Sequence, residues 1–153
     1  MQTDLLLSAY FGELYGIAFF TTFANKYSDD NHIHKWQLLI KVEQITAIKL
    51  KAGLNAINIA CPDHDSEMEI KGQRDAESWL NLEWNSLVDT LANWVEPYAL
   101  RYRQQAANAT SHHGLYQLVA EHEDVIWAFL HAEQNDVGSG VTILEAFIDK
   151  HSL

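Results

Sequence analysis

The sequence is patterned along most of its length by apolar residues that recur at steps of three and four. This spacing places them on one face of an α-helix, whose period is about 3.6 residues. Four long stretches and one short one follow the pattern: Thr3 or Asp4 to Tyr27, His32 to Leu54, Asp75 to Ala107, His113 to Glu133, and Val141 to His151. The chain is therefore predicted to be all-α.

The connections between these stretches differ in length. Polar residues 28–31 and 108–112 form short turns, which place consecutive helices antiparallel and side by side. Residues 55–73 lack a helical period, and we interpret them as a long crossover; a strand at 56–60 would have no partner strand. This connectivity is typical of a four-helix bundle with one long crossover, here a single domain of residues 1–153 with a short C-terminal helix.

The third predicted helix contains Pro97, which is expected to kink or divide it. Proline lacks the amide hydrogen, and its ring clashes with the preceding turn. The apolar face of this helix is predicted to include Leu80, Trp84, Leu87 and Tyr98. Tyr98 is thus expected to face the interior.

Composition narrows the classes of protein. The net charge is -11, and such a surface repels phosphate groups, so neither nucleic acid nor a membrane surface is an expected partner. The one cysteine, Cys61, allows no internal disulfide, which favours a reducing compartment and predicts a cytoplasmic protein. Leu5–Ala24 is apolar enough to suggest a membrane span, but Glu13 in its middle favours a buried helix.

Three polar residues fall on predicted apolar faces. Glu13, Glu43 and His122 each lie between apolar residues at helical spacing in the first, second and fourth helices. A carboxylate buried without a partner costs several kcal/mol, so each should have one. Counted at about 1.5 Å per residue, Glu13 lies about nine residues from the start of its helix, Glu43 about eleven from the end of its own, and His122 about ten from the start. In the predicted bundle, all three lie at one level.

This connectivity and these buried groups resemble the ferritin-like superfamily, which includes rubrerythrin and bacterioferritin. The resemblance covers the four main helices. It implies a metal centre, usually of iron, in which each helix pair supplies a Glu and a Glu-x-x-His. Glu13 and Glu43 would be carboxylate ligands and His122 the histidine of the second motif. The pattern is incomplete, because Thr46 stands where it has a histidine and Val119 where it has a glutamate.

Two interpretations of the buried groups stay open. One is a site for a single ion, with Glu123 as a further ligand beside His122; two or three carboxylates and one imidazole suit iron, manganese or zinc. Neighbours on a helix point about 100° apart, so such a site must lie off the helix axis. The other is a hydrogen-bonded network, in which the carboxylates accept from His122 or from one of four tyrosines: Tyr10, Tyr15, Tyr98 and Tyr116.

Three functions follow from these features. The first is association without catalysis, as a homo-oligomer such as a dimer, because the first helix is apolar nearly all round: Tyr10, Phe11, Leu14, Phe19 and Phe23 lie outside its inward stripe. The alternative is a metal-binding protein with redox or oxygen chemistry, and a second alternative is a small-molecule binder. The sequence favours association slightly. Asp63, His64 and Asp65 could hold a metal, but three polar residues after a proline are more typical of a solvated turn.

Overall fold

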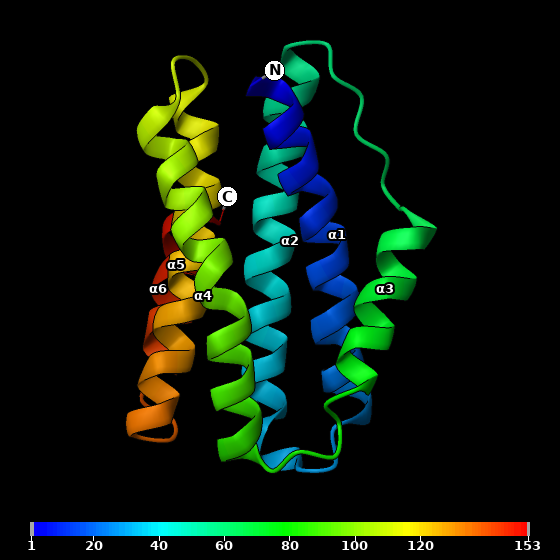
Figure 1. Cartoon of the computed structure of the whole chain (residues 1–153), viewed down its shortest axis with the longest axis vertical. Helices are drawn as coiled ribbons and strands as arrows, with labels where there is room; N and C mark the ends of the chain where they lie inside the picture. The colour runs from blue at the N-terminus through cyan, green and yellow to red at the C-terminus, as the bar shows by residue number, and fades with distance from the viewer. Residues whose placement is uncertain (1, 153) are drawn as a thin grey trace. The chain divides into compact units, whose positions relative to one another are not determined.

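The computed structural model describes residues 2–152, and this part of the chain is all-helical, as predicted, with no strand (Figure 1). Its elements in chain order are α1 (Gln2–Lys26), the 3₁₀ helix η1 (Asp30–His32), α2 (Ile33–Ala56), α3 (Ser66–Glu77), α4 (Trp84–Asn108), α5 (His113–Asn135) and α6 (Val141–His151). The contacts divide the chain into two compact units, Met1–Asn81 and Leu82–Leu153, each described here by itself.

In the first unit, α1 contacts α2 along one side and α3 along another (Figure 1). Aromatic side chains of α1 make contacts on both of these sides. Phe23 stacks on Trp36 of α2, with ring centroids 4.5 Å apart, and Phe19 packs edge-on against Trp79, just after α3, with centroids 6.0 Å apart. Both phenylalanines are fully buried. Because two helices cover α1, its apolar character extends beyond a single stripe. By length and composition, Thr3–Lys26 would also suffice to cross a membrane, although 50% of its most apolar window is buried.

The prediction of an irregular crossover over residues 55–73 is wrong in its second half, because α3 begins at Ser66. The side chain of Asp65 caps this helix by accepting from the amide of Met68 at 3.0 Å, and the amide of Asp65 donates to Glu69 at 3.1 Å. Only Gly72 and Ala76 of α3 are buried. The buried residues of the face that packs against α1 are thus small, so they leave no periodic pattern of large apolar ones.

The third predicted helix is wrong at its start. The chain leaves the helical conformation after Glu77 and enters α4 at Trp84, so residues 78–83 form a connection rather than a helix. Pro97 lies inside α4, which continues to Asn108, so this proline does not divide the helix. Residues 78–83 contain serine, asparagine and glutamate, which interrupt the spacing of apolar residues only briefly. For this reason the pattern predicted one continuous helix.

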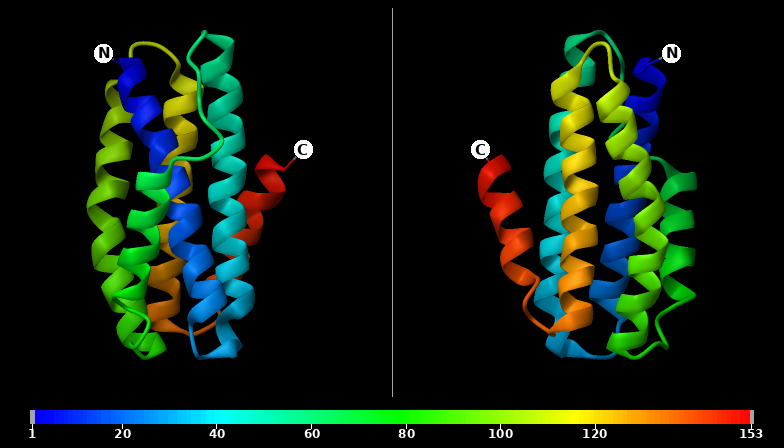
Figure 2. Two further views of the ribbon diagram at one scale, coloured as in Figure 1. Left: turned by 90° about the vertical axis from the view of Figure 1, so that its right-hand side faces the viewer. Right: turned by 60° about the vertical axis from the view of Figure 1, so that its left-hand side comes forward.

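In the second unit, α4 and α5 pack side by side and α6 returns along α5 (Figure 2). The interior face of α4 carries Leu87, Leu91 and Val95 and continues at Ala99. Tyr98, predicted to face inward, is 37% exposed, because the step of four from Val95 reaches Ala99 instead. On α5, the buried face includes Val119, Ile126 and Phe129, and His122 lies between them.

Candidate metal centre

Glu13 and Glu43 form the carboxylate pair of the first unit. They come from α1 and α2, and only 2% and 4% of their surfaces are exposed. One carboxylate oxygen of each lies within 4.8 Å of the other. Two ionised carboxylates this close repel each other strongly where water is excluded, and a bound cation removes that repulsion. The predicted burial of both glutamates is confirmed.

Gly16 provides the space that Glu43 occupies. It lies on α1 one turn after Glu13, so both residues share a face of the helix. A Cβ at position 16 would lie 2.7 Å from Cδ of Glu43 and closer still to Oε2. The carboxylate therefore rests against bare helix backbone beside Glu13. The sequence analysis missed this role; the only signal was a glycine three residues after a buried glutamate.

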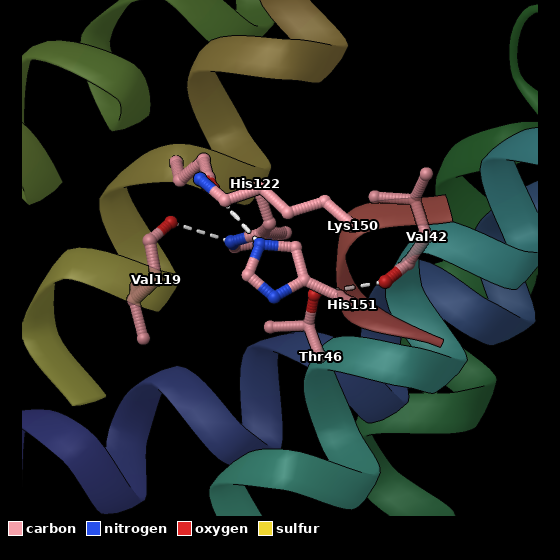
Figure 3. A network of polar contacts seen from close by, with 7 residues as sticks. Val42, Thr46, Val119, His122, Lys150 and His151 are labelled. Carbon is pink, nitrogen blue, oxygen red and sulfur yellow. Dashed lines mark hydrogen bonds and ion pairs between the residues drawn. The ribbon is translucent and has the colours of Figure 1, made fainter. Parts of the chain in front are cut away.

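His122 is the buried imidazole of the second unit, with 2% of its surface exposed. Its Nδ1 lies 2.5 Å from the backbone carbonyl oxygen of Val119, one turn earlier on α5 (Figure 3). A carbonyl oxygen only accepts hydrogen bonds, so Nδ1 must carry the hydrogen and donate it. The lone pair of the neutral ring is then on Nε2, as is usual for a histidine that binds a metal through that nitrogen.

Glu123 faces this lone pair. Its Oε2 lies 3.2 Å from Nε2 of His122, and its side chain is 14% exposed. A carboxylate oxygen is also an acceptor, so a neutral His122, with one hydrogen, cannot donate to both neighbours. Either a proton lies between the two groups, on Nε2 of an imidazolium or on the carboxyl group of Glu123, or a cation is shared by Nε2 and the carboxylate. Two ligands about 2.1 Å from one ion and nearly at right angles lie about 3 Å apart, so the observed separation fits a shared cation as well as a hydrogen bond.

At two positions, 46 and 119, the chain lacks the ligand that the ferritin-like pattern would place there. The residues found at these positions have other contacts. Thr46 is fully buried, and its hydroxyl donates to the carbonyl oxygen of Val42 at 2.8 Å within α2 (Figure 3). Val119 is apolar and buried, and offers its backbone oxygen to His122. Of the four ligands predicted from the sequence, two lie in each unit: Glu13 and Glu43 in the first, and His122 and Glu123 in the second.

The hydrogen-bonded network proposed as an alternative loses some of its five donors, while His122 and Tyr116, both buried, stay candidates for it. The hydroxyl of Tyr10 donates to the carbonyl oxygen of Pro62 at 2.6 Å. The hydroxyl of Tyr15 donates to Asp75 at 2.5 Å. Tyr98 is partly exposed to solvent. A phenol has one hydrogen to donate, so neither Tyr10 nor Tyr15 can also donate to Glu13 or Glu43.

The other acidic and histidine residues considered from the sequence have structural roles. Asp63 pairs with Lys51, His64 lies 3.2 Å from Glu69, and Asp65 caps α3. The prediction of a solvated turn is supported there by the exposure of the side chains of Asp63 and His64, 78% and 83%.

Comparison with known proteins adds no relative to this picture. No protein-family model, curated protein or solved structure matches the chain. The resemblance to the ferritin-like superfamily therefore stays a prediction, and the argument for function rests on the residues themselves.

Proposed function

We propose that this protein binds one divalent metal ion through Glu13, Glu43, His122 and Glu123, and that α1, α2, α4 and α5 form a ferritin-like four-helix bundle around it. The observation that carries the proposal is the ring of His122. Its Nδ1 is engaged by Val119 and its Nε2 faces the carboxylate of Glu123. Two acceptors that face each other at this distance need a proton, on Nε2 or on the carboxyl group, or a cation between them.

The charges of the proposed ligands favour a metal ion over a proton alone. Glu13, Glu43 and Glu123 contribute three carboxylates, two of them almost fully buried. A single imidazolium offsets one negative charge, whereas a divalent ion offsets two and is coordinated directly by the oxygens. The remaining net charge is small, which lowers the cost of burying these groups.

The ligand set also limits the metal. Three carboxylates and one imidazole suit Mn²⁺, Fe²⁺ and Zn²⁺, and the absence of thiolate ligands disfavours Cu⁺. Four side chains are enough for one ion but too few for two. Because Thr46 and Val119 replace two ligands of the ferritin-like pattern, the expected stoichiometry is one ion per chain.

Association, which the sequence favoured slightly, loses its main argument. That argument was the apolar surface of α1 outside its inward stripe. Phe19 and Phe23 are fully buried by contacts within the first unit, and Tyr10 and Leu14 are 2% and 7% exposed. The chain itself covers these four side chains, so they require no second subunit, whereas Phe11 is only half-buried.

The test is metal content and affinity. Protein purified without chelator is analysed for metals, stripped, and titrated calorimetrically with Mn²⁺, Zn²⁺ and, without oxygen, Fe²⁺. We expect one ion per chain and a loss of binding in Glu43→Gln and in His122→Gln. His113→Gln, which changes an exposed histidine on the same helix, is the matched control and should bind as the wild type does. A wild type that binds none of these ions, or a His122→Gln variant that binds them normally, contradicts the proposal.

A further inference from the structure

Gly16 differs from Gly72, Gly114, Gly138 and Gly140 in what lies beside it. The three atoms nearest to a Cβ at position 16 all belong to the side chain of Glu43. At Gly72 the nearest atom is the backbone oxygen of Tyr15, and at Gly114 no atom lies within 4 Å. The gap at Gly16 thus accommodates one carboxylate, whereas Gly72 serves the packing of two helices.

A glycine inside a helix is unfavourable, because it loses more backbone freedom on folding than alanine does. Gly16 lies near the middle of α1, far from either end, where no turn or cap requires it. It is buried, so exposure to solvent does not explain it either. The clear structural consequence of the missing side chain is the position of the Glu43 carboxylate beside Glu13.

We propose that Gly16 is a positioning residue for the metal ligand Glu43. This inference rests on the proposed function and adds the reason why α1 and α2 hold two carboxylates at one point. The bare backbone of α1 lets the Glu43 carboxylate approach Glu13. A methyl group at position 16 would occupy the place of Oε2 and force the side chain of Glu43 into another rotamer.

If Gly16 positions a ligand, its replacement should lower metal affinity without lowering thermal stability. Replacing a glycine with a purely structural role would lower both. The obstructing atoms in Gly16→Ala are the far end of a flexible side chain, so the backbone need not move. Alanine is also a better helix former than glycine. We therefore expect Gly16→Ala to keep or raise the thermal midpoint of the metal-free protein while it weakens Mn²⁺ and Zn²⁺ binding by about 10-fold or more, as misplacing a ligand does.

The experiment compares wild type, Gly16→Ala and Gly114→Ala by calorimetric titration with Mn²⁺ and Zn²⁺ and by thermal unfolding of the stripped protein. Gly114→Ala is the control, since its added methyl group meets nothing within 4 Å. It should bind both ions as the wild type does. Normal affinity in Gly16→Ala overturns the inference and leaves the metal site intact.

A double variant covers the remaining outcomes. If Gly16→Ala fails to fold, Gly16→Ala with Glu43→Ala should fold again, because the second change removes the obstructed side chain; continued unfolding contradicts the inference. If the wild type binds no metal, the proposed function fails. In that case Gly16 cannot be a positioning residue for a metal ligand either. The thermal midpoints of the wild type, Gly16→Ala, Glu43→Ala and the double variant then decide whether residues 16 and 43 interact at all.

Discussion

Nε2 of His122 lies 3.2 Å from Oε2 of Glu123, although the two residues are consecutive on α5. Neighbouring side chains leave a helix about 100° apart, so they converge only when the glutamate curls along the helix surface. His122 is buried and Glu123 is partly exposed, so their meeting point lies at the edge of the interior. This is the off-axis position that shared coordination of one ion by both residues requires.

Glu123→Gln tests this contact. The amide keeps one oxygen but removes the negative charge, so we expect metal affinity to fall by about 10- to 100-fold, as for other charged groups that contact a metal or its ligand. Titration calorimetry measures the change. Asp124→Asn is the matched control, because Asp124 is the next residue and pairs with Arg103 at the surface. Equal losses in both variants would show that general surface charge, rather than Glu123, governs binding.

Glu133 is a buried carboxylate with a structural role. It is 1% exposed, and it accepts from the indole Nε1 of Trp84 at 3.3 Å and from the amide of Gly138 at 3.0 Å. It thereby joins the start of α4 to the turn between α5 and α6. Its eleven-residue separation from His122 along the helix corresponds to about 16 Å, so it cannot reach the same ion.

Glu133→Gln should therefore destabilise the protein without changing metal affinity. The amide retains one acceptor and brings a donor towards two donors, so we expect a loss of about 1–3 kcal/mol in the free energy of unfolding, measured in urea. Glu145→Gln, at an exposed position on α6, should change it by less than about 0.5 kcal/mol. Weaker metal binding in Glu133→Gln with unchanged stability would contradict this assignment.

The sequence predicted the helices whose burial depends on large apolar side chains, and missed the features that depend on small ones. α5 and α6 follow their predicted ranges closely, because residues such as Phe129 and Phe147 repeat at helical spacing. α3 was missed because it meets α1 through Gly72 and Ala76. A helix is recognised in the sequence by large apolar residues at regular spacing. Two backbones that approach closely through small residues leave no such pattern.

The candidate site was predictable only where it depends on a charged residue among apolar ones. A charged residue between apolar ones is visible in one sequence, so Glu13, Glu43 and His122 could be singled out and their burial is confirmed. Glu123 could also be named as a candidate beside His122, but its approach to Nε2 depends on rotamers, which helical phase does not predict. The space beside Gly16 that the Glu43 carboxylate occupies depends on the distance between α1 and α2. The spacing of residues along one helix does not give that distance.

The contact between α5 and α6 should weaken in acid. Glu121 of α5 is 2.8 Å from both Lys150 and His151 of α6. Burial raises the pKa of Glu121, but the hydrogen bonds from Lys150 and His151 together lower it more, so the pKa lies below its usual value of 4.5. A lowered pKa in the folded state means that the unfolded chain binds this proton first. The stabilisation is therefore fully present above about pH 4.5 and is lost as the pH falls through the lower folded value.

Hydrogen exchange of the α6 amides measures this loss. We expect their protection, corrected for the intrinsic exchange rate, to fall below about pH 4.5 in the wild type. The effect should be modest, because ion pairs near the surface contribute about 0.2–1 kcal/mol. In Glu121→Gln the protection at neutral pH should already be lower, and this acid-dependent step should be absent. The same step in Glu121→Gln would assign it to another group.

At Gly72, α3 approaches the backbone of α1 closely, and this contact provides a test of the fold of the first unit. A Cβ there would lie 2.5 Å from the backbone oxygen of Tyr15 and 3.1 Å from the backbone nitrogen of Phe19. Backbone atoms cannot rotate away as the end of a side chain can, so Gly72→Ala must push α3 off α1. That shift would also strain the hydrogen bond between Tyr15 and Asp75.

We expect Gly72→Ala to reduce the free energy of unfolding by about 1–3 kcal/mol, in line with other overpacked sites. Gly114→Ala should instead raise it by up to about 1 kcal/mol, because the added methyl group only improves helix propensity. Urea denaturation of the two metal-free variants beside the wild type compares them directly. Faster proteolytic cleavage within residues 57–77 of Gly72→Ala would locate the damage at α3. If Gly72→Ala and Gly114→Ala shift stability equally, the close approach of α3 to α1 is wrong.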